Sequence, residues 1–349
     1  MVGRALPDLP RRFLIIRLSA MGDVLLTTPA VRMLKKRFPD SRIDFLVKAR
    51  FAPLLQENPG LNRVLAFSGN GRPAEFFHLL RDIRRRKYDV VADLQGNVRS
   101  FLFSRLSGAR IIVRPRLMRI KRFFLVRWHY DLYGDAPPVP LRYLRALKLF
   151  GVEDDGGGMD LKVPDLAQKR ISGILRQHNM ESHDNSLLVL APGAGRRTKQ
   201  WLPQRYAEVG TYFNKHGMQT IIAGGEGDAD ICRKVASMTA GKVLNMCGEL
   251  SISETAALVS RAAVMIANDT GVMHMAAAMQ VPLVALFGPT TGQLGFFPFR
   301  ARAIVAESDI PCRPCSYHGT ERCPKGHFDC MRKITSDTVI REAESIMKK

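Results

Sequence analysis

The sequence lacks both a long apolar run and a signal-like start. None of its apolar stretches approaches the ~18 residues that a membrane-spanning helix needs. The opening segment, MVGRALPDLPRR, has no apolar core of the kind found in secretory signal peptides. We therefore expect a cytoplasmic protein. In that compartment the six cysteines are predicted to be reduced thiols or metal ligands rather than disulfides.

The first strand-to-helix turn lacks the glycine-rich phosphate motifs, GxGxxG and the P-loop. This turn, RLSAMGDVLLTTPA, spans residues 17–30 between the apolar run 13–16 and a helical pattern over 30–37. Turns of this kind usually bind phosphate, because free N–H groups and the helix dipole attract anions. Here the turn carries a carboxylate, Asp23, which would repel a phosphate. The turn therefore predicts a chemistry other than anion binding.

Acidic residues are scarce in the first half. The chain has a formal net charge of +21, and residues 1–150 carry 30 Lys and Arg against 11 Asp and Glu. No acid lies between Asp93 and Asp131. A one-sided excess predicts an anionic partner, such as nucleic acid, anionic lipid or a phosphorylated or carboxylated substrate. A solvated surface is the alternative. The nine bases of that interval are Arg99, Arg105, Arg110, Arg114, Arg116, Arg119, Lys121, Arg122 and Arg127.

Short apolar runs of the β type alternate with helical patterns in both halves. The alternation predicts an α/β fold with parallel sheets built from βαβ units, and two Rossmann-like domains facing a central cleft. The predicted strands are 13–16, 43–47, 63–67, 89–95 and 109–113, then 186–192, 219–225, 242–248, 263–269 and 282–288. The predicted helices are 30–37, 76–86, 203–216, 228–239, 253–261 and 271–280.

The two halves are joined by an acidic, glycine-rich stretch, GVEDDGGGMDLKVP, at 151–164. Such a composition is typical of a loop or linker. We expect a first domain at 1–165, a second at 183–334 and a final helix at 335–349.

Three predicted strand ends of the second half carry glycine and polar residues, in GAGRRTKQW, GGEGD and NDTGVMH. Ligands of parallel sheets bind at the carboxyl ends of strands. Asp269 or Thr270 can cap the helix that begins at Gly271 while its N–H groups point outward, and His274 lies one turn further on the same face. Together they predict a nucleotide site with its pyrophosphate at the helix start. A plain capping turn and a structural histidine are the alternatives.

Several segments in order along the chain carry a family resemblance. RLSAMGDVLLTTPAVRMLKKRFP, DLQGNVRS, PGAGRRTKQWLPQRYAEV, GGEGD and NDTGVMHMAAAMQVPLVALFGPT together resemble the lipopolysaccharide heptosyltransferases of glycosyltransferase family nine, in the heptosyltransferase II-like group. The resemblance implies a GT-B fold, with an acceptor domain, a nucleotide-sugar domain and a last helix that crosses back to the first. It also implies inverting transfer of L-glycero-D-manno-heptose from ADP-heptose to the lipopolysaccharide inner core.

The resemblance assigns catalytic roles to two residues. Asp23 matches the aspartate that is the family's proposed general base, which would take the proton of the attacking acceptor hydroxyl. An N-cap role is the alternative for Asp23. Lys199 matches the family's lysine at the diphosphate, where the charge of the leaving ADP develops. No metal or other cofactor is implied.

The resemblance also implies a set of donor-binding residues. Glu226 matches the position at the nucleoside ribose, and Asp269 and His274 match positions at the donor sugar and phosphates. Thr270 and Gly271 would supply backbone donors. Gly195 belongs to a loop, residues 193–195, in which the family often has Thr or Ser. Backbone N–H groups must replace those hydroxyls here.

The resemblance also implies an anionic partner for the basic first half, because inner-core acceptors carry carboxylates and phosphates and lie at an anionic membrane surface. Arg99 matches a family position associated with acceptor binding. We expect Arg116, Arg119, Lys121 and Arg122 to bind the same anionic acceptor.

Aromatic and basic residues alternate between Arg110 and Arg127. The apolar members are Phe123, Phe124, Leu125 and Trp128. Such a mixture suits peripheral contact with the cytoplasmic face of the inner membrane. The alternative is a basic loop that packs its aromatics into the domain.

A cysteine cluster near the end of the chain resembles a metal site in part. Cys312, Cys315, Cys323 and Cys330, with His318 and His327 nearby, have the ligand types of zinc, but only one C-x-x-C pair. We favour reduced structural cysteines over zinc. Cys232 and Cys247 read as small core residues.

Two other functions compete with this interpretation. The basic half and the cysteine cluster allow a nucleic-acid-binding protein, but no helix-turn-helix, RRM or C₂H₂ pattern supports it. A GT-B transferase that uses another nucleotide sugar is the closer rival. We expect ADP-heptose and an inner-core acceptor as partners, and no nucleic acid.

Overall fold

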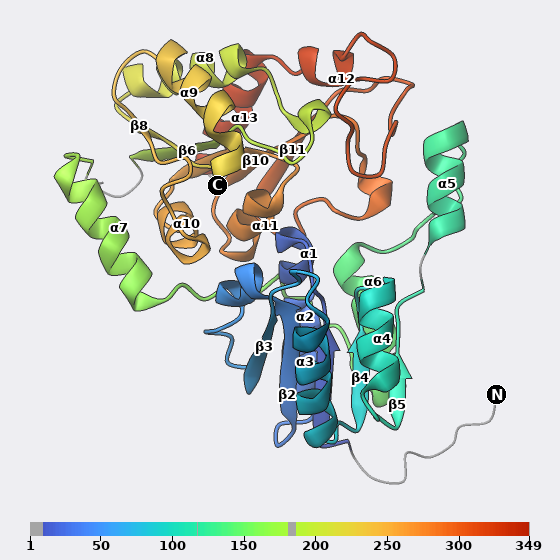
Figure 1. The fold of residues 1–349 in the computed structure, drawn as a ribbon. Helices are drawn as coiled ribbons and strands as arrows, with labels where there is room; N and C mark the ends of the chain where they lie inside the picture. The colour runs from blue at the N-terminus through green and yellow to red at the C-terminus, as the bar shows by residue number, and fades with distance from the viewer. Residues whose placement is uncertain (1–9, 117, 181–185, 349) are drawn as a thin grey trace. The chain divides into compact units, whose positions relative to one another are not determined.

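The computed structural model describes residues 10–116, 118–180 and 186–348 (Figure 1). Contacts divide these residues into two compact units. The first contains the described residues up to 116 together with 140–157, and the second contains 118–139 and the described residues from 158 onward. The chain passes from the first unit to the second for the last time at 157–158, which falls within the predicted linker. The predicted first domain, 1–165, differs from the first unit at 118–139 and at 158–165. Residues 118–139 pack with the second unit, where Leu125 and Tyr133 share an apolar cluster with Leu294.

The first unit is built on a five-stranded parallel sheet with the order β3-β2-β1-β4-β5. Its central strands are buried on both faces, as expected for continuous apolar runs such as FLII. All five strands match predicted ones. They are β1 (Arg12–Ile16), β2 (Arg42–Lys48), β3 (Arg63–Phe67), β4 (Val90–Asp93) and β5 (Ile111–Val113).

Helices α3 and α4 cover one face of this sheet, where Leu80, Ile83 and Phe103 pack against Leu14 and Leu46. The helices of the first unit are α1 (Met21–Leu25), α2 (Thr28–Arg37), α3 (Pro73–Arg85), α4 (Val98–Leu106) and α6 (Val139–Leu147), with short 3-10 turns at η1 (Ala49–Leu54) and η2 (Lys148–Phe150).

The second unit contains a six-stranded parallel sheet with the order β11-β10-β9-β6-β7-β8. Five strands match predictions. The sixth, β11, is a partly exposed edge strand with a short apolar core, so its sequence signal is weak. The strands are β6 (Leu187–Ala191), β7 (Gln219–Ile222), β8 (Val243–Asn245), β9 (Val264–Asn268), β10 (Leu283–Phe287) and β11 (Ala303–Glu307).

The predicted helices of the second half all form, as α8 to α11. The full set in this unit is α5 (Arg119–Trp128), α7 (Asp165–Gln177), α8 (Pro203–Lys215), α9 (Ala229–Met238), α10 (Ile252–Val259), α11 (Gly271–Ala278), α12 (Asp329–Arg332) and α13 (Ser336–Met347), with η3 (Arg197–Lys199), η4 (Glu226–Asp228) and η5 (Gly292–Leu294).

The last helix, α13, packs on the second sheet. Its buried side chains Val339, Ile340, Ala343 and Ile346 belong to the apolar core of the second unit. The apolar stripe of this helix is therefore used within the second unit. No helix within the described ranges is long and apolar enough to cross a membrane.

Candidate functional site

Asp23 lies in α1, just beyond the carboxyl end of β1. Its Oδ2 accepts the backbone N–H of Ala20 at 3.1 Å, and its Oδ1 lies 2.6 Å from Nη2 of Arg17. The contact with Ala20, the residue before the helix, is of the capping-box type, so a capping role coexists with the predicted one. The Asp23 side chain is 22% exposed, which leaves the carboxylate accessible.

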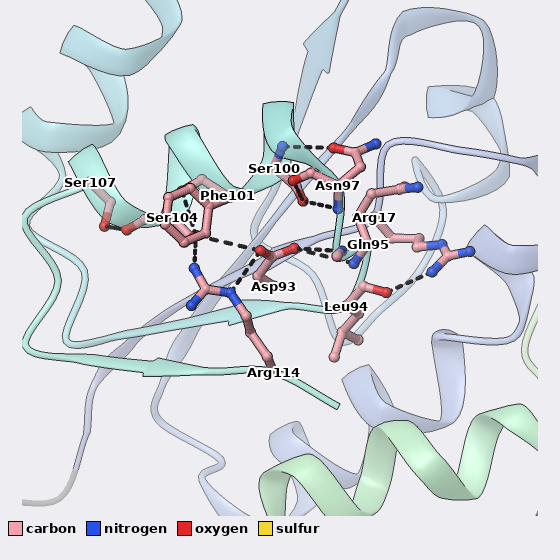
Figure 2. Close-up of polar contacts among 11 residues, drawn as sticks. Arg17, Asp93, Leu94, Gln95, Asn97, Ser100, Phe101, Ser104, Ser107 and Arg114 are labelled. Carbon is pink, nitrogen blue, oxygen red and sulfur yellow. Dashed lines mark hydrogen bonds and ion pairs between the residues drawn. The ribbon is translucent and has the colours of Figure 1, made fainter. Parts of the chain in front are cut away.

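Arg17 is a functional candidate that the sequence reasoning missed. Its buried guanidinium also donates from Nη1 to the carbonyl of Leu94 at 2.6 Å, after β4 (Figure 2), and lies 5.7 Å from the ring centre of Tyr143. Burial opposes the charged form, but the nearby Tyr143 and Asp23 outweigh it and raise the pKa of Arg17. The sequence could have indicated Arg17, because it is a basic residue at the end of a buried strand and lies six residues before Asp23.

The loop after β4 holds the Asp23 turn from the neighbouring strand. Gln95 accepts the backbone N–H of Ser19 through its Oε1 at 3.0 Å. Asp93 is fully buried at the strand end and accepts the Nε–H of Arg114 at 3.0 Å and the N–H of Gly96 at 3.1 Å (Figure 2). These contacts fix the loop from which Gln95 and Leu94 reach the Asp23 turn.

The second unit brings Lys199 and Asp269 together. Lys199 Nζ lies 2.6 Å from Oδ2 of Asp269, and both side chains are largely buried. The hydroxyl of Thr290 donates to the same carboxylate oxygen at 2.8 Å. Two residues that are 70 positions apart in sequence thus form one charged pair at the carboxyl edge of the sheet.

Arg313 supports the Lys199–Asp269 pair indirectly, and it was not singled out from the sequence. Its Nη2 donates to the carbonyl of Thr290 at 2.9 Å, and its other nitrogens donate to the carbonyls of Gly288 and Ser308. Its side chain is 6% exposed and pairs with Glu307. Arg313 therefore orders the loop after β10 that carries the Thr290 hydroxyl to Asp269.

The start of α11 carries no side-chain cap. Thr270 is the N-cap by position, but its side chain makes no capping hydrogen bond, and the Asp269 carboxylate is used by Lys199 and Thr290. The expectation that Asp269 or Thr270 caps the helix through its side chain is wrong for this reason. The first N–H groups of α11, from Gly271, remain suited to an anion. His274 is buried one turn further along.

Glycine loops follow β6 and β7 at the same edge. A Cβ on Gly193 would lie 2.1–2.4 Å from the carboxyl atoms of Asp228, so the glycine lets this side chain from the loop after β7 approach the loop after β6. The same carboxylate accepts the N–H of Gly225, within its own loop, at 3.0 Å. Gly195 has open space around it, and Glu226 is exposed.

Asn268 links these loops to the lysine segment. It is fully buried at the end of β9, and its Nδ2 donates to the carbonyls of Pro192 and Gly193 at 2.8 and 3.2 Å. Its Oδ1 accepts the N–H of Trp201 at 3.1 Å. One side chain therefore fixes both ends of the segment that carries Gly195 and Lys199. The NDTG motif signalled this residue, but only its neighbours were singled out.

The predicted acceptor-binding residues divide between the two units. Arg99 is exposed at the start of α4, 5.6 Å from the ring centre of Phe67, and Arg116 is exposed beyond β5 in the same unit. Arg119, Lys121 and Arg122 lie on α5 and pack with the second unit, where Arg122 lies over the Tyr317 ring. The structure therefore does not gather all five residues on one unit.

Helix α5 exposes half of its apolar side chains. Ile120, Phe123 and Trp128 are 73%, 47% and 55% exposed, whereas Leu125 is buried. The alternative of aromatics packed into the domain therefore describes only part of this segment, with Leu125 as its buried anchor.

The cysteine segment contains free thiols throughout its described residues. Cys312 Sγ lies 3.7 Å from Nε2 of His327, and no group of three or more His, Cys, Asp or Glu residues in the described ranges is arranged to hold a metal ion. Burial raises the pKa of Cys330 to about 12. The segment also holds the turn that carries Lys199, since the backbone carbonyl and N–H of Thr320 both form hydrogen bonds with the Thr198 hydroxyl.

The two units, each built on a parallel, doubly wound sheet, have the architecture of the GT-B class of glycosyltransferases. The model of glycosyltransferase family 9 (heptosyltransferase) matches residues 76–324, and the chain belongs to this family. Its members transfer sugars, so the protein is an enzyme.

Individual proteins give the same picture. The chain is 28% identical to lipopolysaccharide heptosyltransferase 3 of Escherichia coli, and the aligned region covers 77% of this chain and 81% of that one. It is 27% identical to lipopolysaccharide heptosyltransferase 2 of Salmonella typhimurium, covering 96% and 98%. The solved structure of the E. coli ADP-heptose LPS heptosyltransferase II superposes with a TM-score of 0.75 at 22% identity, over 97% and 98% of the chains.

Proposed function

We propose that the enzyme transfers L-glycero-D-manno-heptose from ADP-heptose to the lipopolysaccharide inner core. The observation that carries the proposal is the Lys199–Asp269 pair, 2.6 Å apart between the glycine loops and the uncapped start of α11. Cation and N–H donors at one sheet edge suit a diphosphate leaving group. Two lipopolysaccharide heptosyltransferases and an ADP-heptose LPS heptosyltransferase among the similar proteins support this donor and acceptor class.

The proposed chemistry is a single inverting displacement. An acceptor hydroxyl attacks the anomeric carbon of the heptose as Asp23 takes the hydroxyl proton, and the bond between that carbon and the diphosphate oxygen breaks. Lys199 and the N–H groups of Thr270 and Gly271 stabilise the charge on the departing ADP. Arg17 holds the Asp23 carboxylate in a fixed orientation throughout. The reaction as written needs no metal, and the cysteine segment has a structural role.

Further donor roles follow from position. We assign Glu226, exposed after β7, to the ribose hydroxyls, and Gly195 to backbone contacts with the phosphates. Asp269 holds Lys199, and His274 supports the helix start from its buried position. The acceptor contacts are assigned to Arg99 and Arg116 in the first unit.

We also propose peripheral contact with the cytoplasmic face of the inner membrane through α5. Exposed Phe123 and Trp128 beside Arg119 and Lys121 fit the interface between anionic headgroups and acyl chains. Replacing both aromatics by serine is expected to weaken binding to phosphatidylglycerol vesicles, and unchanged binding would remove this assignment.

The test of the donor is a screen with a heptose-deficient inner-core acceptor. ADP-heptose is expected to support transfer with stoichiometric ADP release. Turnover with a UDP- or GDP-sugar instead would favour the rival transferase. A salt-sensitive DNA complex without any sugar transfer would favour the nucleic-acid-binding alternative.

A further inference from the structure

The first unit contains an arginine-lined pocket at the amino ends of its strands, the edge opposite to Asp23. The pocket has a volume of about 510 Å³. Since β1 spans Arg12–Ile16, the pocket and the Asp23 turn lie roughly 13 Å or more apart along the strand. Its lining residues are Arg12, Arg42, Asp44, Asn62, Arg63, Arg85, Arg86 and Tyr88.

The strand register brings three of the arginines to one face of the sheet. Arg12 pairs with Arg42 across β1 and β2, and Asp44 pairs with Arg63 across β2 and β3. Register partners point to the same face, as do residues two apart such as Arg42 and Asp44. Arg12, Arg42 and Arg63 therefore converge by sheet geometry. Like charges placed directly opposite each other are destabilising unless a counter-charge is present.

The acidic residues nearby are already engaged. Asp44 is buried and accepts the Tyr88 hydroxyl at 2.6 Å, with Arg86 at 3.8 Å. Asp82 pairs with Arg86 at 3.0 Å. Asp89 accepts the backbone N–H groups of Arg11 and Arg12, both at 2.9 Å.

Three pocket arginines keep their guanidinium groups available. Within the described part of the chain, the side chains of Arg42, Arg63 and Arg85 form no ion pair or hydrogen bond, and all three are exposed. The planar guanidinium group matches the oxygen geometry of phosphate and binds it in a bidentate manner. The pocket thus has five arginines and one carboxylate among its lining residues, and three of these arginines have no carboxylate partner within the described residues.

We propose that this pocket binds a phosphate-bearing anion, at a site separate from the donor and acceptor sites. The phosphate has two sources, a small diphosphate in solution or a lipid headgroup. A second hollow of about 520 Å³ adjoins the pocket along α3, shares Arg85 with it and is lined by Phe77, which is 63% exposed. An exposed aromatic beside arginines would add affinity for a membrane surface, but none for a small inorganic diphosphate.

The experiment maps arginine modification residue by residue. The intact protein is treated with phenylglyoxal alone, with inorganic pyrophosphate, or with vesicles of phosphatidylglycerol or phosphatidylcholine, and the adducts are located by mass spectrometry. Pyrophosphate or phosphatidylglycerol is expected to slow modification of Arg42, Arg63 and Arg85 by at least ~10-fold. The exposed Arg105 and Arg341 serve as reference sites, where the rates stay unchanged.

Paired variants separate a built site from general charge. In the double variant Arg42→Gln/Arg63→Gln, protection of Arg85 from phenylglyoxal is expected to disappear. The control variant Arg105→Gln/Arg341→Gln loses the same net charge, and protection of Arg85 is expected to remain. If vesicles protect the arginines and Phe77→Ser weakens that protection, the phosphate comes from a lipid headgroup. If pyrophosphate alone protects them, the phosphate comes from a soluble molecule. No protection, or equal protection at the reference arginines, overturns the proposal. None of these readouts depends on sugar transfer, so they stand apart from the proposed function.

Discussion

Arg17 Nη2 lies 2.6 Å from Oδ1 of Asp23, and the same guanidinium reaches the carbonyl of Leu94 through Nη1. A buried arginine at the end of β1 thus orients a partly exposed carboxylate and ties it to the end of β4. Charge-assisted hydrogen bonds of this kind fix geometry more strongly than neutral ones. The proposed base is therefore held by the sheet and is more than a surface residue of a short helix.

Replacing Asp23 by asparagine separates its two roles. The amide oxygen of Asp23→Asn can still accept the N–H of Ala20, but it cannot take a proton. We expect kcat to fall by ~10²-fold or more, with donor affinity close to wild type. Asp23→Ala, which also removes the cap, should lose stability in addition. Full turnover in the asparagine variant would leave only the capping role.

Replacing Arg17 tests the orientation of the base. We expect Arg17→Ala to lower kcat by more than ~10-fold and Arg17→Lys to recover part of the loss, because one donor to Asp23 is kept. Donor binding should not change, since the donor residues lie in the other unit. Equal loss of stability and turnover in both variants, with no recovery by lysine, would indicate a purely structural arginine.

The sequence predicted the sheets well but the supporting contacts poorly. Buried parallel strands consist of continuous apolar runs, so the sequence pattern predicts ten of the eleven strands. It does not predict the edge strand β11. Lys199 and Asp269 were singled out by motif, and the structure places them in contact. Arg17 and Arg313 act through backbone carbonyls of distant segments, and no local pattern encodes such partners. The place of α5 in the second unit could not be predicted from local sequence either, because it depends on packing between Leu125 and the distant Leu294.

Lys199 and Arg313 should act on the leaving group to different degrees. Lys199→Met removes a cation at the proposed diphosphate, and we expect the ADP dissociation constant to rise by at least ~10-fold. Arg313→Lys should weaken ADP binding less, because it disturbs Thr290 and Asp269 without touching the nucleotide. Isothermal titration with ADP measures both. If Lys199→Met and Asp269→Asn both bind ADP as wild type does, the nucleotide lies elsewhere.

The buried thiol of Cys330 should resist alkylation. Its pKa of about 12 means that the reactive thiolate is scarce at pH 8, and Cys330 is also inaccessible. We expect iodoacetamide to label Cys330 more slowly than Cys323 in the folded protein, and the rate at Cys330 to rise as the pH approaches 12. Labelling in denaturant provides the control, where the two rates should converge. Rapid labelling of Cys330 at neutral pH would contradict the buried environment.

The basic residues should act on the acceptor in two separable groups, since the structure divides them between the units. Neutralising Arg99 and Arg116 in the first unit, or Arg119, Lys121 and Arg122 on α5, should raise the acceptor KM and leave the donor KM unchanged. Exposed charges are screened over ~8 Å at physiological salt, so the wild-type acceptor KM should also rise with ionic strength.

A detergent-solubilised acceptor distinguishes the two groups. If α5 contacts the membrane, its variant should recover wild-type kinetics once the bilayer is absent, whereas the Arg99 and Arg116 variant should keep its raised KM. The first-unit variant should also show a flatter salt response in both settings, because the charges that sense the salt have been removed. Acceptor kinetics and salt slopes equal to wild type in both variants would mean that these five bases form a solvated surface, and that the anionic acceptor binds elsewhere.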